Sequence, residues 1–191
     1  MMSYSSLFRM PTPMKITGRS SSITNAFISS IIPVIQPTEA EIKKALSILG
    51  MTPETFQCSY CGATASEWDH LRPLVLDKRP TGYLSEIRNL VPACGKCNQS
   101  KGNREWREWI RSDAKLSPKT KGIADLDEKV ERLADYENWG KPSKIDFESI
   151  LDRELWKQHW NNHERVQNAM RESQELAEQI RKKVASTHNS R

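Results

Sequence analysis

The chain has 191 residues, of which 37% are hydrophobic and 28% are charged. This length can bury a core without disulfides, and the composition is too apolar for a wholly disordered chain. No stretch approaches the roughly 18–20 apolar residues that a membrane helix needs, and we find no signal peptide, so we expect a cytoplasmic protein without a membrane span. The net charge of +5 is compatible with a polyanionic partner but does not identify one.

The N-terminal part of the chain predicts an irregular arm followed by helices. Residues 1–20 contain two prolines and no apolar period, so we expect an irregular arm there. Residues 21–55 predict a helical segment. Its clearest helix covers residues 39–49, because Thr38 and Glu41 have the spacing of a capping box.

The central part of the chain, residues 56–112, has the pattern of a small mixed domain. Strand composition occurs at 68–76 and again at 89–91, with a loop at 78–82 between them. Helical spacing returns after Cys97. We therefore expect two strands followed by a helix in this region.

Residues 113–191 predict a helical extension that serves either DNA contact or dimerisation. Within it, one long helix is expected over about 146–186, with apolar positions from Val166 to Val184 at heptad-like spacing. Pairing with a second copy and packing against the same domain explain these positions equally well.

All four cysteines fall into two C-x-x-C pairs, Cys58 with Cys61 and Cys94 with Cys97, with 32 residues between the pairs. Each pair can offer two thiolates from one turn of chain, so the two pairs complete a tetrahedral zinc site. Disulfide bonds would need an oxidising compartment. We therefore predict a structural Zn²⁺, which has no open coordination position and performs no chemistry itself.

Residues suited to phosphodiester hydrolysis lie between and beside the cysteine pairs. His70 can take a proton from water because imidazole titrates near neutral pH. Asp69 and Asn98 offer carboxylate and amide oxygens, which are the donors that Mg²⁺ prefers. A strand sends Asp69 and His70 to opposite faces, so one can bind a metal ion while the other meets the water.

The order of these residues resembles the HNH endonucleases of the ββα-metal superfamily. The matching motifs are D-H-x-x-P from Asp69, N-L-x-x-x-C-x-x-C-N from Asn89 and K-G from Lys101, all within residues 56–112. The resemblance implies a mostly helical α+β fold. Its small ββα-metal core would carry the zinc knuckles and be flanked by N- and C-terminal helices.

The same resemblance implies a role for each site residue. His70 would be the general base, and Asp69 and Asn98 would bind the catalytic ion, Mg²⁺ or another divalent cation. Asn89 would orient the loop or the histidine. The family's third signature position is often His, and here it is Asn98. Cleavage would leave a 5′-phosphate and a 3′-hydroxyl, and DNA rather than RNA is the implied substrate.

Basic residues surround this group. Lys101, Arg104, Arg107 and Arg111 would share one side of a helix if the helix runs continuously through Gly102. Such a face beside a metal site suits a phosphate backbone. The predicted DNA contacts are Arg72, Lys78, Arg79, Lys101, Arg104 and Arg107.

The combined prediction is a metal-dependent HNH endonuclease that cuts DNA, of restriction or anti-phage type. A non-catalytic zinc module that binds DNA, and a homing or mobile-element nicking enzyme, remain alternatives. One HNH site cuts one strand per engagement. Cutting both strands at a fixed position is therefore simplest for a homodimer.

Overall fold

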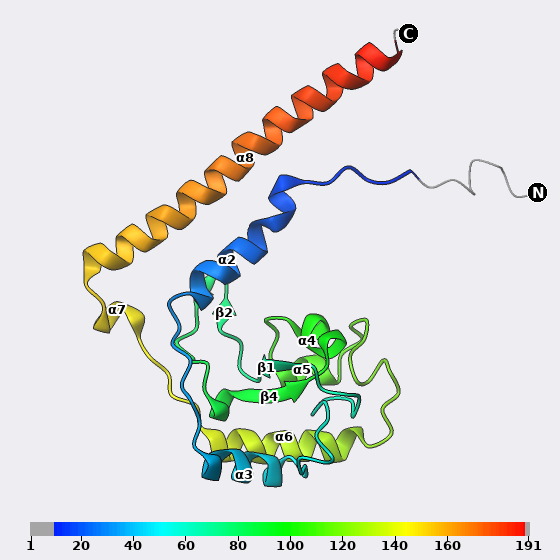
Figure 1. Ribbon diagram of the computed structural model, residues 1–191, viewed down its shortest axis with the longest axis vertical. Helices are drawn as coiled ribbons and strands as arrows, with labels where there is room; N and C mark the ends of the chain where they lie inside the picture. The colour runs from blue at the N-terminus through cyan, green and yellow to red at the C-terminus, as the bar shows by residue number, and fades with distance from the viewer. Residues whose placement is uncertain (1–9, 190–191) are drawn as a thin grey trace, which may run out of the picture. The chain divides into compact units, whose positions relative to one another are not determined.

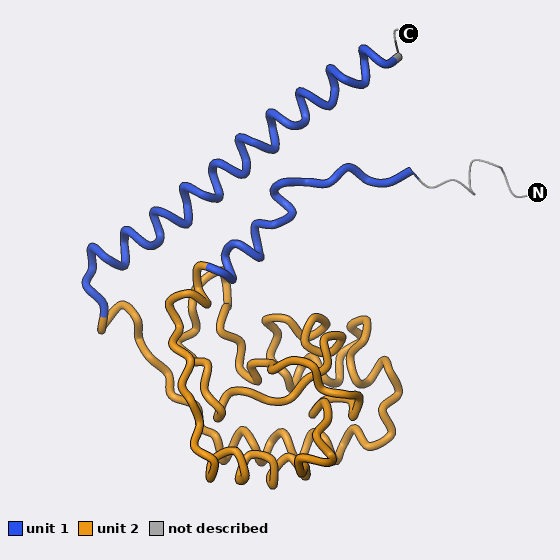
Figure 2. The backbone as a smooth tube through the Cα atoms, in the orientation of Figure 1, with its two compact units in different colours: residues 1–26, 151–191 blue, residues 27–150 orange. Residues whose placement is uncertain are grey.

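The computed structural model describes residues 10–189, which form two compact units (Figure 2). One unit comprises residues 27–150, and the other joins the residues before 27 to those from 151 onward. The first half of the predicted N-terminal arm lies outside the described residues. The elements are η1 (Ile16–Arg19), α2 (Ser20–Ser29), α3 (Glu39–Ile48), β1 (Glu67–His70), β2 (Val75–Leu76), β3 (Arg79–Pro80), η2 (Ile87–Asn89), β4 (Leu90–Ala93), α4 (Gly95–Lys101), α5 (Trp106–Ile110), α6 (Leu126–Gly140), α7 (Phe147–Ile150) and α8 (Arg153–Asn189).

The predicted capping box starts α3 as expected. The Thr38 side chain accepts a hydrogen bond from the backbone of Glu41, whose carboxylate accepts one from the Thr38 backbone at 2.9 Å. The helix ends one residue before the predicted position, because Leu49 is its C-cap and Gly50 adopts a φ of +66°. That left-handed conformation favours glycine and stops the helix.

Strands β1 and β4 form an antiparallel pair that is followed directly by α4 (Figure 1). Glu67 lies opposite Ala93 at one end of the pair, and His70 lies opposite Leu90 at the other. Helix α4 packs against β1 and brings Cys94 and Cys97 to the sheet. This β–β–α unit within a mostly helical chain confirms the predicted α+β fold class.

The predicted strand over 68–76 is in fact two strands in two sheets. β1 ends at His70, and β2 pairs instead with β3 in a short hairpin. Pro73 lies between the two strands, and a proline cannot donate a hydrogen bond to a sheet ladder. The hairpin turns at Asp77 and Lys78, both of which have positive φ, as two-residue hairpin turns require.

The expectation of one continuous helix through Gly102 is wrong. α4 ends at Lys101, Gly102 has a φ of +54°, and α5 begins only at Trp106. The chain must turn at Gly102, where a side chain would be strained. The basic residues from Lys101 to Arg111 therefore do not share one helix face.

The core of the 27–150 unit is aromatic. Trp106 and Trp109 are fully buried. Tyr60 meets the ring of Trp109 edge-on at 5.1 Å, and Tyr136 of α6 is also fully buried. α3 and α6 lie on one side of the β1–β4 pair and α4 on the other (Figure 1).

In the second unit, α8 contacts the chain before residue 27 through side-chain hydrogen bonds. The backbone N–H of Ile16 donates to Gln174 at 2.7 Å, and Thr24 Oγ1 lies 2.9 Å from His163 Nε2. The first of these bonds anchors η1, which begins inside the segment predicted to be irregular. Irregular chain ends at Lys15, not at residue 20.

The long C-terminal helix predicted over 146–186 is divided into α7 and α8. Asp152 caps α8, because its Oδ1 accepts hydrogen bonds from the backbone of Glu154 at 2.9 Å and Leu155 at 3.0 Å. Ile180 and Val184 are more than half exposed. Dimerisation through this helix stays a prediction. None of the described helices has the length and apolarity needed to cross a membrane.

Candidate functional site

The four cysteines meet at the junction of the turn before β1 and the start of α4. All four sulfur atoms lie within 4.8 Å of one another, and Cys61 Sγ is 3.7 Å from Cys94 Sγ. A tetrahedral zinc site with bonds of about 2.3 Å places its sulfurs about 3.8 Å apart. The donor set and its spacing therefore fit a four-thiolate metal site.

The sulfur atoms of the cluster interact strongly with one another. Hydrogen bonds with Cys58 and Cys97 hold the pKa of Cys61 well below its usual value, and the same contacts raise the pKa values of Cys58 and Cys97. Lys121 donates from Nζ to Cys97 Sγ at 3.1 Å. A four-thiolate metal site carries excess negative charge, so a nearby ammonium group stabilises it.

Asp69 lies on the buried face of β1 and is held by two side chains. The Tyr60 hydroxyl donates to Asp69 Oδ2 at 2.5 Å, and Lys101 Nζ lies 3.1 Å from the same oxygen. Burial raises the pKa of Asp69, and its contacts with Lys101 and Tyr60 partly offset that rise. The carboxylate is therefore fixed in place from the core side.

Lys101 is an interior residue, with only 1% of its surface exposed. Besides pairing with Asp69, its ammonium donates to the carbonyl of His70 at 2.7 Å. Burial lowers the pKa of Lys101, and Asp69 partly offsets this. A buried ammonium has no exposed surface to offer a phosphate, so the predicted DNA contact at Lys101 has no support in this structure.

His70 is half-buried at the end of β1, and a hydrogen bond of 2.9 Å joins its Nε2 to Ser85 Oγ. Ser85 is itself held, because its carbonyl accepts from the backbone N–H of Ile35 at 2.9 Å. Burial and the Lys101 ammonium lower the pKa of His70 to about 4. The imidazole is therefore neutral near pH 7, which is the form that can accept a proton.

Asn98 projects from α4 towards β1, where its Nδ2 donates to Glu67 Oε2 at 2.6 Å. Because the amide nitrogen faces Glu67, the carbonyl oxygen Oδ1 points away from that carboxylate. Gly95 makes room for this contact, since a Cβ there would lie 2.8 Å from Glu67 Oε1. Glu67 was not among the residues predicted from the sequence. Its position two residues before Asp69, on the same strand face, is the signal that could have identified it.

Asn89 is fully buried and holds the chain that follows His70. Its Oδ1 accepts from the backbone N–H of Arg72 at 2.8 Å, and its Nδ2 donates to the Arg72 carbonyl at 3.1 Å. A third bond runs to the carbonyl of Leu84 at 3.3 Å. The side chain thus joins the two ends of the loop between the strands.

The structure disperses the other basic residues that were predicted to contact DNA. Lys78 and Arg79 are exposed at the β2–β3 hairpin. Arg104 folds back and donates to the last carbonyl groups of α4, at Ser100 and Lys101. Arg72 and Arg107 converge on a carboxylate of α6, which the sequence analysis did not identify.

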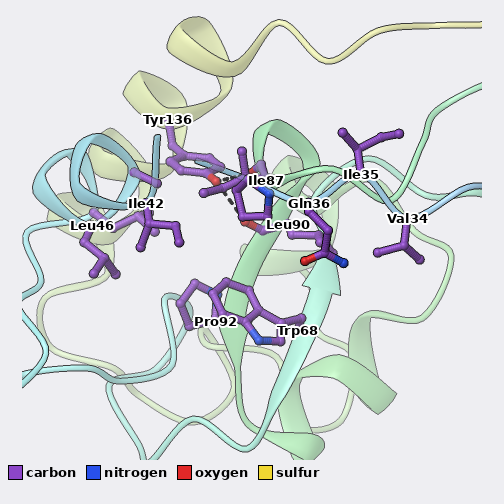
Figure 3. Close-up of a pocket in the computed structure, with 13 residues that line it drawn as sticks. Val34, Ile35, Gln36, Ile42, Leu46, Trp68, Ile87, Leu90, Pro92 and Tyr136 are labelled. Atoms are coloured by element: carbon purple, nitrogen blue, oxygen red, sulfur yellow. Dashed lines mark hydrogen bonds between the residues drawn. The ribbon is translucent and has the colours of Figure 1, made fainter. Parts of the chain in front are cut away.

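The face of β1 opposite to Asp69 is apolar around Trp68, and His70 lies at its end. Trp68 and Pro92, which are cross-strand neighbours, form one wall of a pocket of about 280 Å³ (Figure 3). Ile42 and Leu46 of α3 line another part of it, and none of the described residues that line it is charged. The carboxylates of β1 therefore lie on the face towards α4, away from this pocket.

Together, β1 and α4 place the neutral imidazole of His70, the buried carboxylate of Asp69 and the amide of Asn98 within one β–β–α unit. This set can accept a proton and can offer oxygen atoms to a hard divalent cation. These three residues are the ones predicted from the sequence, and the structure adds the residues that contact them: Tyr60, Glu67, Ser85 and Lys101.

Comparisons with known proteins agree with this geometry. Residues 58–104 match the family of HNH endonucleases. A CRISPR-associated endonuclease Cas9 from Corynebacterium diphtheriae is 32% identical over 81 residues, which are 40% of this chain and 7% of that protein. The chain thus spans a small fraction of the length of this relative. No solved structure gave a significant match. Residues 58–104 of this chain are therefore similar to the HNH endonuclease family.

Proposed function

We propose that this protein is a metal-dependent endonuclease that hydrolyses phosphodiester bonds in DNA. The observation that carries the proposal is the β–β–α unit, in which β1 supplies His70 and Asp69 and α4 supplies Asn98. Residues 56–112 are its proposed nuclease core, and residues 113–191 its helical extension.

His70 is the proposed general base, which takes a proton from the attacking water. Its neutral ring is held at the end of β1 by Ser85. In the tautomer that carries its proton on Nε2, the ring donates to the Ser85 hydroxyl oxygen, and Nδ1 is left available as the acceptor. Asn89 fixes the chain that follows and thereby the direction in which His70 leaves the strand.

Asp69 and Asn98 are the proposed ligands of the catalytic ion, Mg²⁺ or another divalent cation. Carboxylate and amide oxygens fit the donor preference of such ions. When bound, the ion would supply positive charge beside the phosphate. Asp69 is held by Tyr60, and Asn98 by Glu67, so the chain orients both donors. The four cysteines are proposed to hold a structural Zn²⁺.

Plasmid cleavage tests the function. Purified wild-type protein with Mg²⁺ should nick or linearise supercoiled DNA and leave 5′-phosphate and 3′-hydroxyl ends. His70→Ala should lower the rate by about 10²–10⁴, the usual contribution of general acid–base catalysis, while DNA binding and zinc content stay near wild type. Near-wild-type turnover in this variant would refute the role of His70.

The same assay separates the alternatives. A non-catalytic DNA-binding module would bind the plasmid but leave it uncut at every divalent ion tested. A restriction or anti-phage role, our first choice, predicts cleavage of unmodified phage DNA at defined positions. A homing or mobile-element nicking enzyme would instead leave one cut strand at a rare site. Light scattering of the protein on DNA tests the predicted homodimer.

A further inference from the structure

Glu137 on α6 is a buried carboxylate that binds two arginines from distant parts of the chain. Its Oε1 lies 2.8 Å from Arg72 Nη2, and its Oε2 accepts from Arg107 Nη2 at 2.7 Å and from Arg107 Nε at 3.2 Å. The Nε1 of buried Trp106 also donates to Oε1, at 3.3 Å. Arg107 and Glu137 both lie outside the segment that matches the HNH family.

Each guanidinium is also fixed by an aromatic ring. Arg107 lies over Trp106, with 4.5 Å from its Cζ to the ring centroid, and Arg72 lies 5.6 Å from the centroid of Tyr83. An arginine that is already fixed loses less conformational freedom when it binds a ligand.

The cluster of Arg72, Arg107 and Glu137 has a net positive charge, and that charge is accessible to solvent. Two guanidinium groups share one carboxylate, so the cluster has a net positive charge. The side chains of Arg72 and Arg107 are 31% and 52% exposed, whereas that of Glu137 is only 9% exposed. A guanidinium has five N–H donors, and Glu137 engages only part of them. The remaining donors suit an anion with several oxygen atoms, such as a phosphate.

The position of Arg72 links the cluster to the nuclease site. It lies two residues after His70, so the two Cα atoms are at most about 7 Å apart. The backbone between them is fixed, because Leu71 N–H donates to the Asn89 carbonyl at 2.7 Å and Arg72 N–H to the Asn89 side chain at 2.8 Å. Asn89 thus holds the backbone of Arg72, and Glu137 holds its side chain.

We propose that Arg72 and Arg107 form a clamp for a backbone phosphate of the DNA beside His70, with Glu137 as the positioning residue of the clamp. This inference rests on the proposed nuclease function and extends it to a substrate contact. The clamp positions the strand without reading its sequence, because every nucleotide carries the same phosphate.

Salt-dependent DNA binding tests the clamp, and a His70→Ala background prevents cleavage during the titration. Arg111 provides the matched control: its side chain is also 52% exposed, but it pairs with exposed Asp127. Losing one phosphate contact reduces the slope of log K against log salt by about 0.9. We expect that reduction for Arg72→Ala and Arg107→Ala, and no change for Arg111→Ala. Equal slopes for the Arg107 and Arg111 variants would overturn the clamp.

For Glu137→Gln, the change in net charge and the loss of the clamp predict opposite changes in DNA affinity. The substitution makes the protein more positive, so charge alone predicts tighter DNA binding. The clamp predicts weaker binding, by about tenfold at low salt, because the arginines lose their shared charged anchor. Circular dichroism establishes that the Glu137→Gln variant is folded. A second variant, Arg107→Lys, keeps the positive charge but loses the planar guanidinium group, so it should also bind DNA more weakly. Binding as tight as wild type in both variants would refute the positioning role of Glu137.

The outcomes also separate failure of the clamp from failure of the proposed function. If the wild-type protein cuts DNA but these variants bind DNA normally, only the clamp fails. If the wild-type protein neither binds nor cuts DNA, the proposed function fails.

Discussion

The cysteine cluster and the His70 site use the same two segments of the chain but are held together differently. Each cysteine pair is local in the chain, and packing of the turn at 58–62 on β4 brings all four sulfur atoms within 4.8 Å of one another; these sulfur atoms are themselves the ligands. At the His70 site each proposed ligand is bound by a second side chain, Asp69 by Lys101 and Asn98 by Glu67. At the cysteine site a supporting side chain, Lys121, contacts Cys97, whereas at the His70 site each proposed ligand has a side chain behind it.

The difference has a physical reason. A four-thiolate zinc site is closed, so correct ligand spacing is its main requirement. A catalytic site must keep its donors oriented while leaving room for water and substrate, and this requires supporting contacts. The following substitutions test whether the two sites differ in this way.

The largest effect is expected at the cysteine cluster. Cys94→Ser should leave the 27–150 unit unfolded at 25 °C. Structural zinc contributes about 10–16 kcal/mol in small zinc domains, which is as large as the stability of most domains. Circular dichroism and zinc content per chain measure this. Asn98→Ala is the matched control, since it removes a proposed ligand of the other site and should stay folded with its zinc. A folded, zinc-free Cys94→Ser protein would contradict the structural role.

The sequence was sufficient for the cysteine site because ligand spacing is a local property. His70, Asp69 and Asn98 were also predicted from the same pattern, and the structure places them on β1 and α4 of one β–β–α unit; their roles stay predictions. Glu137 could not be found in this way: it lies 65 residues from Arg72, and only packing brings the two together. The burial of Lys101 was missed for a related reason. Its spacing fitted a basic helix face, but the turn at Gly102 separates it from the arginines that follow.

An intermediate effect is expected at the buried pair of Lys101 and Asp69. Lys101→Met leaves the Asp69 carboxylate without its cation, and breaking a buried pair in this way costs about 3–5 kcal/mol. Urea denaturation measures the loss. Adding Asp69→Asn should recover part of it, because the stranded charge is then removed. Arg111→Met is the control, since its exposed pair with Asp127 is worth about 1 kcal/mol or less. Equal losses in the two methionine variants would show that Lys101 does not stabilise Asp69.

The smallest effect is expected at Glu67, and it should appear in metal dependence more than in stability. Glu67 accepts from Asn98 Nδ2 and so fixes which amide atom is available to an ion. Supporting residues of this kind typically change metal affinity by about 10–100-fold. We expect Glu67→Ala to raise the Mg²⁺ concentration for half-maximal cleavage about tenfold. The rate at saturating Mg²⁺ should change only a few-fold.

The conservative variant distinguishes position from charge at this site. Glu67→Gln keeps an oxygen that can accept from Asn98, so its Mg²⁺ requirement should lie between those of wild type and Glu67→Ala. Glu128→Ala is the control, because that carboxylate pairs with Arg132 on α6 and has no contact with Asn98. If Glu67→Ala keeps the wild-type Mg²⁺ dependence, Asn98 does not need its partner. The two metal sites would then differ in ligand chemistry alone, and not in how the chain supports them.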